Sequence, residues 1–142
     1  MEDVRALFTE YTSSLGVDLS YQNYAEEFSN LPGKYAPPGG GLYVALCDGK
    51  AAGCVGFRKL DLERCEMKRL YVRSQFRGLG IGKALAERAI CGARAAGYRF
   101  MLLDTLASME NALRLYRALG FAETAPYYET PVKGTRFLRL EL

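Results

Sequence analysis

The sequence lacks histidine altogether and contains only four cysteines among its 142 residues. Without histidine, neither a Ser-His-Asp triad nor the common pairing of a nucleophilic cysteine with a histidine base can form. The four cysteines, at positions 47, 54, 65 and 91, include no C-x-x-C pair, so we expect no metal site. Because Cys47, Cys54 and Cys65 lie in strand-like apolar segments, we expect reduced, buried thiols.

A long apolar run is also missing, since no segment reaches the ~20 residues that a membrane-spanning helix needs. The first residues, Met1-Glu2-Asp3, are acidic, and no basic segment followed by an apolar stretch suggests a secretory signal. We therefore expect a cytoplasmic protein without a membrane partner. With 49% apolar and 25% charged residues, the chain fits one globular domain over residues 1–142.

The net charge of +3 is unevenly placed. Between Arg58 and Arg99, eleven lysines and arginines stand against four acidic residues, so the rest of the chain is acidic. A local basic region of this kind suits a small phosphorylated ligand. Nucleic acid is the rival partner, but the sequence has no dense basic run and no basic-aromatic interleaving, which disfavours it.

Apolar periodicity and turn residues predict the order of helices and strands. The expected elements are helices over 4–15 and 21–31, strands over 42–47, 51–60 and 64–73, a helix over 79–96, a strand over 100–103, a helix ending at 119, and strands from 121 and over 135–142. Asp48-Gly49 is a hairpin signal, and Gly16, Gly97 and Gly120 are helix stops. Ser108 is the expected cap of the last helix. This order implies a mixed α/β sheet.

The segment that carries the chemistry is a strand followed by a turn with three glycines, Gly78, Gly80 and Gly82. Glycines allow close approach of a ligand, and the free N–H groups at the start of the following helix form an anion site. Arg77 and Lys83 add positive charge at the two ends. Lys83 stands where a dinucleotide-binding fingerprint needs its third glycine. A Walker loop fails as well, because Arg77 replaces its first glycine and no Ser or Thr follows Lys83.

Here the chain resembles the GNAT family of N-acetyltransferases over about residues 4–140. The family's phosphate turn, Gln/Arg-x-x-Gly-x-Gly/Ala, matches in two frames, Gln75…Gly78…Gly80 and Arg77…Gly80…Gly82. A second block over 111–121 matches the family pattern Asn…Ala…Leu-Tyr…Gly-Phe. The resemblance implies that acetyl-CoA is the co-substrate and that it contacts Leu70, Tyr71, Val72, Gln75, Arg77, Gly78, Leu79, Gly80, Ile81, Gly82, Lys83 and Asn111.

The resemblance also implies two catalytic residues. Glu66 is expected to act as the base that takes a proton from the amine; alternatively, it is an ordinary strand glutamate that faces solvent or pairs with Lys68 or Arg69. Tyr116 is expected to protonate the leaving thiolate, and it can also pack beside Leu113 and Leu119. Backbone N–H groups of residues 70–72 are expected to stabilise the oxyanion.

The implied fold is a GNAT-like mixed, mostly antiparallel sheet flanked by helices. The family usually begins with a strand before its first helix, and this chain begins almost on that helix. The sheet edge left open favours a homodimer. The implied function is acetyl transfer to a primary amine of a small molecule or peptide, with segments 31–38 and 126–128 flanking the acceptor. A non-catalytic acyl-CoA-binding sensor or subunit is the alternative.

Overall fold

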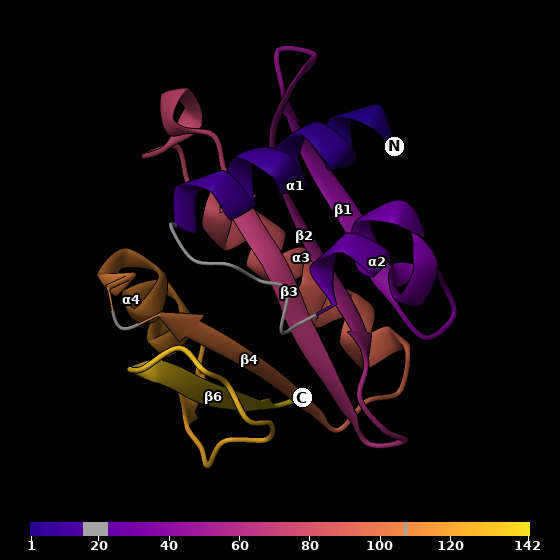
Figure 1. Cartoon of the computed structure of the whole chain (residues 1–142), viewed down its shortest axis with the longest axis vertical. Helices are drawn as coiled ribbons and strands as arrows, with labels where there is room; N and C mark the ends of the chain where they lie inside the picture. The colour runs from indigo at the N-terminus through magenta and orange to yellow at the C-terminus, as the bar shows by residue number, and fades with distance from the viewer. Residues whose placement is uncertain (16–22, 107) are drawn as a thin grey trace.

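A sheet of strands in the order β1-β2-β3-β4-β6-β5 forms the centre of the molecule (Figure 1). The computed structural model describes residues 1–15, 23–106 and 108–142. Within these residues the strands are β1 (Gly41–Cys47), β2 (Lys50–Lys59), β3 (Arg64–Val72), β4 (Phe100–Leu106), β5 (Ala122–Glu123) and β6 (Thr135–Glu141). The helices are α1 (Glu2–Leu15), α2 (Tyr24–Ser29), α3 (Ile81–Ala95) and α4 (Glu110–Ala118), with short 3₁₀ helices at Gly33–Tyr35 and Ser74–Phe76.

Neighbouring strands are antiparallel except β3 and β4, which run parallel. This confirms the expected mixed, mostly antiparallel sheet. β3 pairs with β4 only over Arg64–Glu66 against Phe100–Leu102 among the described residues. Both strands continue beyond that stretch, to Val72 and Leu106. They therefore part along their carboxyl-terminal halves, and a wedge opens between them.

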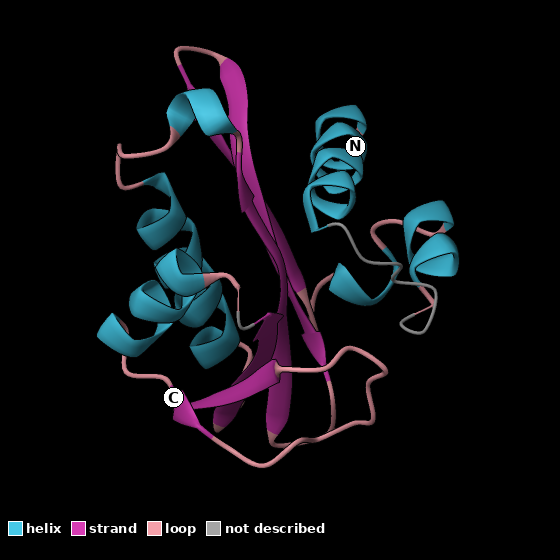
Figure 2. Cartoon of the chain, turned by 60° about the vertical axis from the view of Figure 1, so that its left-hand side comes forward, coloured by secondary structure: helices cyan, strands magenta, loops and turns pink. Residues whose placement is uncertain are grey.

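Helices cover both faces of the sheet, with α3 and α4 on one side and α1 and α2 on the other (Figure 2). On the first side Met67 and Leu103 are buried in a core shared with α3 and α4. On the second side Phe8 and Tyr35 are buried, and their rings meet edge to face at 6.1 Å between centroids. The apolar spacing of α1 thus points into the second core, where it anchors the helix over β2 and β3.

Among the described residues α1 is the first element, and no strand precedes it there, as the sequence led us to expect. One edge of the sheet is β1, where Leu46 is 65% exposed. An open edge of this kind can pair with another strand. The homodimer expected from the sequence stays a prediction.

The turn chemistry was predictable, and the ends of the elements less so. Asp48 and Gly49 join β1 to β2 with φ of 51° and 78°, as a tight hairpin turn requires. The expected start of α3 at residue 79 was wrong, because Gly80 is left-handed (φ 78°) and the helix begins after it. The expected cap at Ser108 was also wrong, since Met109 occupies the capping position of α4.

Two further expected boundaries were wrong. The helix expected over 21–31 is confined to Tyr24–Ser29 in the described residues, and Asn23 ahead of it is left-handed. β4 runs to Leu106 rather than ending at residue 103, because β6 continues to pair with it there. The helix stop expected at Gly16 lies outside the described residues.

The four cysteines are free thiols. Cys54 and Cys65 are fully buried as expected, whereas Cys47 is only half-buried and Cys91 is exposed. No helix in the described ranges is long and apolar enough to cross a bilayer.

Candidate active site

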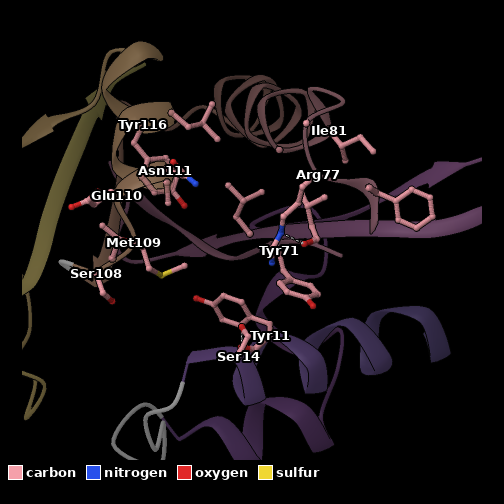
Figure 3. A pocket seen from close by; sticks show the side chains of 18 of the residues that line it. Tyr11, Ser14, Tyr71, Arg77, Ile81, Ser108, Met109, Glu110, Asn111 and Tyr116 are labelled. Atoms are coloured by element: carbon pink, nitrogen blue, oxygen red, sulfur yellow. Dashed lines mark hydrogen bonds between the residues drawn. The ribbon is translucent and has the colours of Figure 1, made fainter. Parts of the chain in front are cut away.

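A cleft of about 640 Å³ lies between the separated ends of β3 and β4. Its walls come from five places: α1, the end of β3, the glycine turn, the end of β4 and the start of α4 (Figure 3). The lining residues are Tyr11, Ser14, Leu70, Tyr71, Val72, Phe76, Arg77, Gly78, Gly80, Ile81, Gly82, Asp104, Thr105, Ser108, Met109, Glu110, Asn111, Ala112, Leu115 and Tyr116. Segments that are far apart in the sequence therefore line the same cleft.

A β-bulge in β3 turns the strand at the mouth of this cleft. Arg69 has a left-handed φ of 60°. The register of β2 shifts so that Val55 faces both Arg69 and Leu70. After the bulge, Leu70 packs toward the α3 side and Tyr71 toward the α1 side. An extra residue of this kind bends the bulged strand, and this bulge follows the stretch where β3 pairs with β4.

Glu27 on α2 holds the bulge in place. Arg69 donates to Glu27 through Nε (2.9 Å) and Nη2 (3.2 Å), and Arg58 Nη1 donates to the same carboxylate at 3.1 Å. Burial alone would raise the pKa of Glu27, but hydrogen bonding and charge from Arg69, with the charges of Arg58 and Lys68, bring that pKa below its ordinary value. A charged contact between α2 and β3 thus offsets the strain of the left-handed arginine.

Removing the Glu27 carboxylate is therefore expected to destabilise the fold. In a Glu27→Ala variant, Arg69 is left as a buried cation without this partner, a change that typically costs ~3–5 kcal/mol. The free energy of unfolding from urea titration measures the loss. Glu26→Ala is the matched control: Glu26 is the exposed neighbour on the same short helix, and we expect it to change the stability by ~0.5 kcal/mol or less. Equal effects in the two variants would contradict this role for Glu27.

The glycine turn forms the basic end of the cleft. Gly78 and Gly80 have φ of 82° and 78°, and a Cβ added at either would meet no atom within 4 Å. Both glycines are therefore needed for their backbone conformation, and both leave open space in front of the turn. Gly80 has no side chain to cap α3, so the first N–H groups of this 15-residue helix are available to an anion. Arg77 lines the same end and donates through Nε to the carbonyl of Val72 (3.1 Å).

Tyr116 and Asn111 form the opposite wall of the cleft, both from α4 (Figure 3). Tyr116 is 7% exposed, and its ring packs edge-on against Phe121. Burial raises the pKa of the Tyr116 hydroxyl above its ordinary value, and Tyr11 and Asp104 raise it further by their charge. The hydroxyl therefore keeps its proton at neutral pH and can act as a donor.

Most of the site residues predicted from the sequence meet at this cleft. Those that line it are Leu70, Tyr71, Val72, Arg77, Gly78, Gly80, Ile81, Gly82, Asn111 and Tyr116. Gln75, Leu79 and Lys83 belong to the same turn or to the first turn of α3, but their side chains are exposed and do not line the cleft. Their contact with a ligand stays a prediction.

Glu66 lies on β3 where that strand still pairs with β4, opposite Leu102, and it does not line the cleft. Its side chain is 3% exposed, and both of its oxygens are engaged. Arg58 Nε donates to Oε1 at 3.1 Å, the Tyr127 hydroxyl donates to Oε2, and Lys68 Nζ is 3.9 Å from Oε2. The carboxylate does not face solvent, as one alternative from the sequence had it, and it lies within ion-pair distance of Lys68, as another did.

Sequence reasoning did not identify two parts of the site. Tyr11 and Ser14 come from α1; the helical spacing placed Tyr11 in the core, but it is half-buried and faces the cleft. Asp104 and Thr105 come from the end of β4, beyond residue 103, where the strand was expected to finish. A carboxylate at the carboxyl end of a strand parallel to β3 is the signal that could have identified Asp104.

The chain matches the model of the acetyltransferase (GNAT) family over residues 1–121. It is 35% identical to an uncharacterised N-acetyltransferase of Dictyostelium discoideum, with 100% of this chain and 94% of that protein covered. An N-acetyltransferase of Schizosaccharomyces pombe is 41% identical over 100% and 88% of the two chains. The N-acetylaspartate synthetase of Rattus norvegicus is 40% identical over 60% of this chain and 29% of its own length.

Solved structures give the same result for the fold. An acetyltransferase from Streptococcus agalactiae superposes with a TM-score of 0.81 at 20% identity, over 97% of this chain and 91% of the other. A GNAT family acetyltransferase from Elizabethkingia anophelis with acetyl-CoA bound is 28% identical, with a TM-score of 0.63 over 73% and 77%.

Proposed function

Because the chain belongs to the GNAT family of acetyltransferases, we propose that it transfers the acetyl group of acetyl-CoA to a primary amine of a small molecule or peptide. One observation carries the proposal: a single cleft has an anion-binding turn at one end and the buried hydroxyl of Tyr116 at the other. Acetyl-CoA carries a pyrophosphate, which suits the turn, and a thioester, whose departing thiolate would take a proton from the hydroxyl. We include in the proposal the cytoplasmic location expected from the sequence.

The residues of the cleft fit acetyl-CoA, which supplies an activated acetyl thioester when bound. The left-handed glycines leave room in front of the turn, and the N-terminus of α3 with Arg77 suits the pyrophosphate. The parted edge of β3 offers backbone groups of Leu70, Tyr71 and Val72 to an extended arm, as a sheet edge does to a peptide. The N–H groups there would stabilise the oxyanion that forms during transfer.

Tyr116 would supply the proton that the departing thiolate needs. Its burial keeps the hydroxyl protonated, and its place on the wall opposite the glycine turn suits the reacting end of the coenzyme. Asn111, one to two turns earlier on α4, would contact the coenzyme from the same wall.

Assaying the release of coenzyme A, with mass spectrometry of the amine products, tests the proposed function. The acceptor panel contains the twenty amino acids, spermidine, ethylamine and a peptide with a free amino terminus. L-Aspartate is included because a relative is an N-acetylaspartate synthetase. We expect N-acetylation of at least one amine. Binding of acetyl-CoA without turnover of any of these amines would instead support a sensor or subunit role.

A further inference from the structure

We propose that Asp104, rather than Glu66, binds the acceptor's ammonium group and removes its proton. The inference rests on the proposed acetyl transfer and names the carboxylate that serves it. Four observations support it: the place of Asp104 in the cleft, the engagement of Glu66, the contact of Asp104 with Tyr128, and its proximity to Tyr116.

Asp104 lies on the part of β4 that no longer pairs with β3, and it lines the cleft. It is half-buried, whereas Glu66 is 2% exposed and lies where the two strands are still paired. The pKa of the Tyr116 hydroxyl is raised mainly by burial, with a contribution from the Asp104 charge. Asp104 therefore shares the cleft with the proposed proton donor.

Glu66 is poorly suited to receive an ammonium group because its two oxygens already have donors. Arg58 donates to one oxygen and Tyr127 to the other, and Lys68 lies close to the second. An acceptor would have to break a buried ion pair to reach this carboxylate, and that costs several kcal/mol. Among the described residues, the donor that an acceptor would have to displace from Asp104 is the hydroxyl of Tyr128.

The Tyr128 hydroxyl donates a hydrogen bond to Oδ2 of Asp104. Tyr128 lies in the loop between β5 and β6, where its ring packs edge-on against Tyr127 and Phe137, each at 5.4 Å between centroids. An ammonium group is also a donor, and its charge makes the stronger bond to a carboxylate. We therefore infer that the acceptor takes the position of the Tyr128 hydroxyl on Asp104.

The proton transfers balance with these residues. The Asp104 carboxylate takes one proton from the ammonium group and passes it to solvent, which leaves a neutral amine with a free lone pair. The amine nitrogen forms the new C–N bond, and Asp104 takes the second nitrogen proton. Tyr116 gives its proton to the sulfur as the C–S bond breaks, and Asp104 returns its proton to the Tyr116 phenolate. The products are the N-acetylated amine, the free thiol and one released proton.

The groups that face Asp104 come from each element around it. Lys68 projects from β3, Tyr116 from α4, and Tyr127 and Tyr128 from the β5–β6 loop. Burial lowers the pKa of Lys68, and the charges of Glu66 and Asp104 act against this. The pH dependence of kcat/KM must therefore be compared between the Asp104 variant and the wild type, because Lys68 also titrates near this carboxylate.

The first test does not require turnover. The protein, saturated with coenzyme A and labelled with ¹³C at the carboxyl carbons of its five aspartates, is titrated with ethylammonium chloride. Asp104→Asn identifies the resonance of Asp104. We expect that resonance to shift saturably, and to saturate at several-fold lower ethylammonium in Tyr128→Phe because the competing hydroxyl is gone. An Asp104 resonance that does not move, or one that moves equally with and without the Tyr128 hydroxyl, would overturn the proposal.

The second test uses the amine that the panel identifies as the best acceptor. Near pH 7, Asp104→Asn is expected to lower kcat/KM by ~10²–10⁴-fold. Because a free alkylamine has a pKa of ~10, the rate of this variant should rise roughly tenfold per pH unit as neutral amine accumulates. Glu66→Gln should instead lower the melting temperature, with kcat/KM per folded molecule reduced less than tenfold.

The reverse assignment, a pH-rescued loss in Glu66→Gln and full activity in Asp104→Asn, would overturn the proposal, and so would equal losses in both variants. If the wild type acetylates no amine in the panel, the proposed function fails. The ethylammonium titration still decides whether Asp104 is an ammonium site.

Discussion

Replacing Tyr116 with phenylalanine is expected to lower kcat by ~10²–10⁴-fold, the usual loss when a positioned general acid is removed. The ring and its edge-on contact with Phe121 remain in this variant, so the wall of the cleft keeps its shape. The affinity for acetyl-CoA should change little, because the hydroxyl acts on charge that develops only as the thiolate leaves. Steady-state kinetics with the best acceptor and calorimetric binding of acetyl-CoA separate the two effects.

Tyr98→Phe is the matched control for this experiment. Tyr98 is also buried, and its hydroxyl donates to the carbonyl of Gly39 at 2.6 Å, outside the cleft. Loss of that bond should cost ~1 kcal/mol of stability and leave kcat unaltered. A Tyr116→Phe enzyme with wild-type kcat would show that the thiolate leaves without this proton, and Tyr116 would then be a packing residue.

Introducing aspartate at Gly80 is expected to abolish the stabilisation that acetyl-CoA gives to the fold. At a concentration 100 times the dissociation constant, a ligand of the native state stabilises it by ~2.7 kcal/mol. The aspartate side chain would enter the open space in front of the turn and place a negative charge at the N-terminus of α3, where the phosphates are expected to bind. Thermal melts with and without acetyl-CoA measure the difference.

Gly49→Asp controls for backbone strain in this experiment. Gly49 is also left-handed (φ 78°), and a Cβ there also meets nothing within 4 Å, but it lies in the β1–β2 hairpin turn away from the cleft. Both variants should lose intrinsic stability, and only Gly80→Asp should lose the response to acetyl-CoA. An undiminished response in folded Gly80→Asp would place the coenzyme elsewhere.

The glycine turn, which the sequence predicted, is made by local backbone chemistry. Gly78 and Gly80 are left-handed because of the turn itself, and the residues that follow form α3 directly after it. The Asp48-Gly49 hairpin is equally local. In each case a few neighbouring residues determine the conformation, so the pattern is visible without the rest of the chain.

The rest of the site depends on contacts between segments that are distant in sequence. The bulge at Arg69 is held by Glu27, 42 residues earlier, and β4 runs past residue 103 because β6 pairs with it. Neither contact can be predicted from the pattern of neighbouring residues in the sequence. The sequence alone could not decide what surrounds the Glu66 side chain, because the fold brings its partners Arg58 and Tyr127 to it. Asp104 was not identified for the same reason.

A crystal structure of the protein with acetyl-CoA tests the central claim most directly. The account predicts that the pyrophosphate lies against the backbone N–H groups of Gly80 and Gly82 at the start of α3. It also predicts that the thioester lies between β3 and β4, with its sulfur within hydrogen-bonding reach of the Tyr116 hydroxyl, at a distance of ~3.5 Å or less. A coenzyme bound outside the wedge, or one whose thioester lies away from Tyr116, would contradict it.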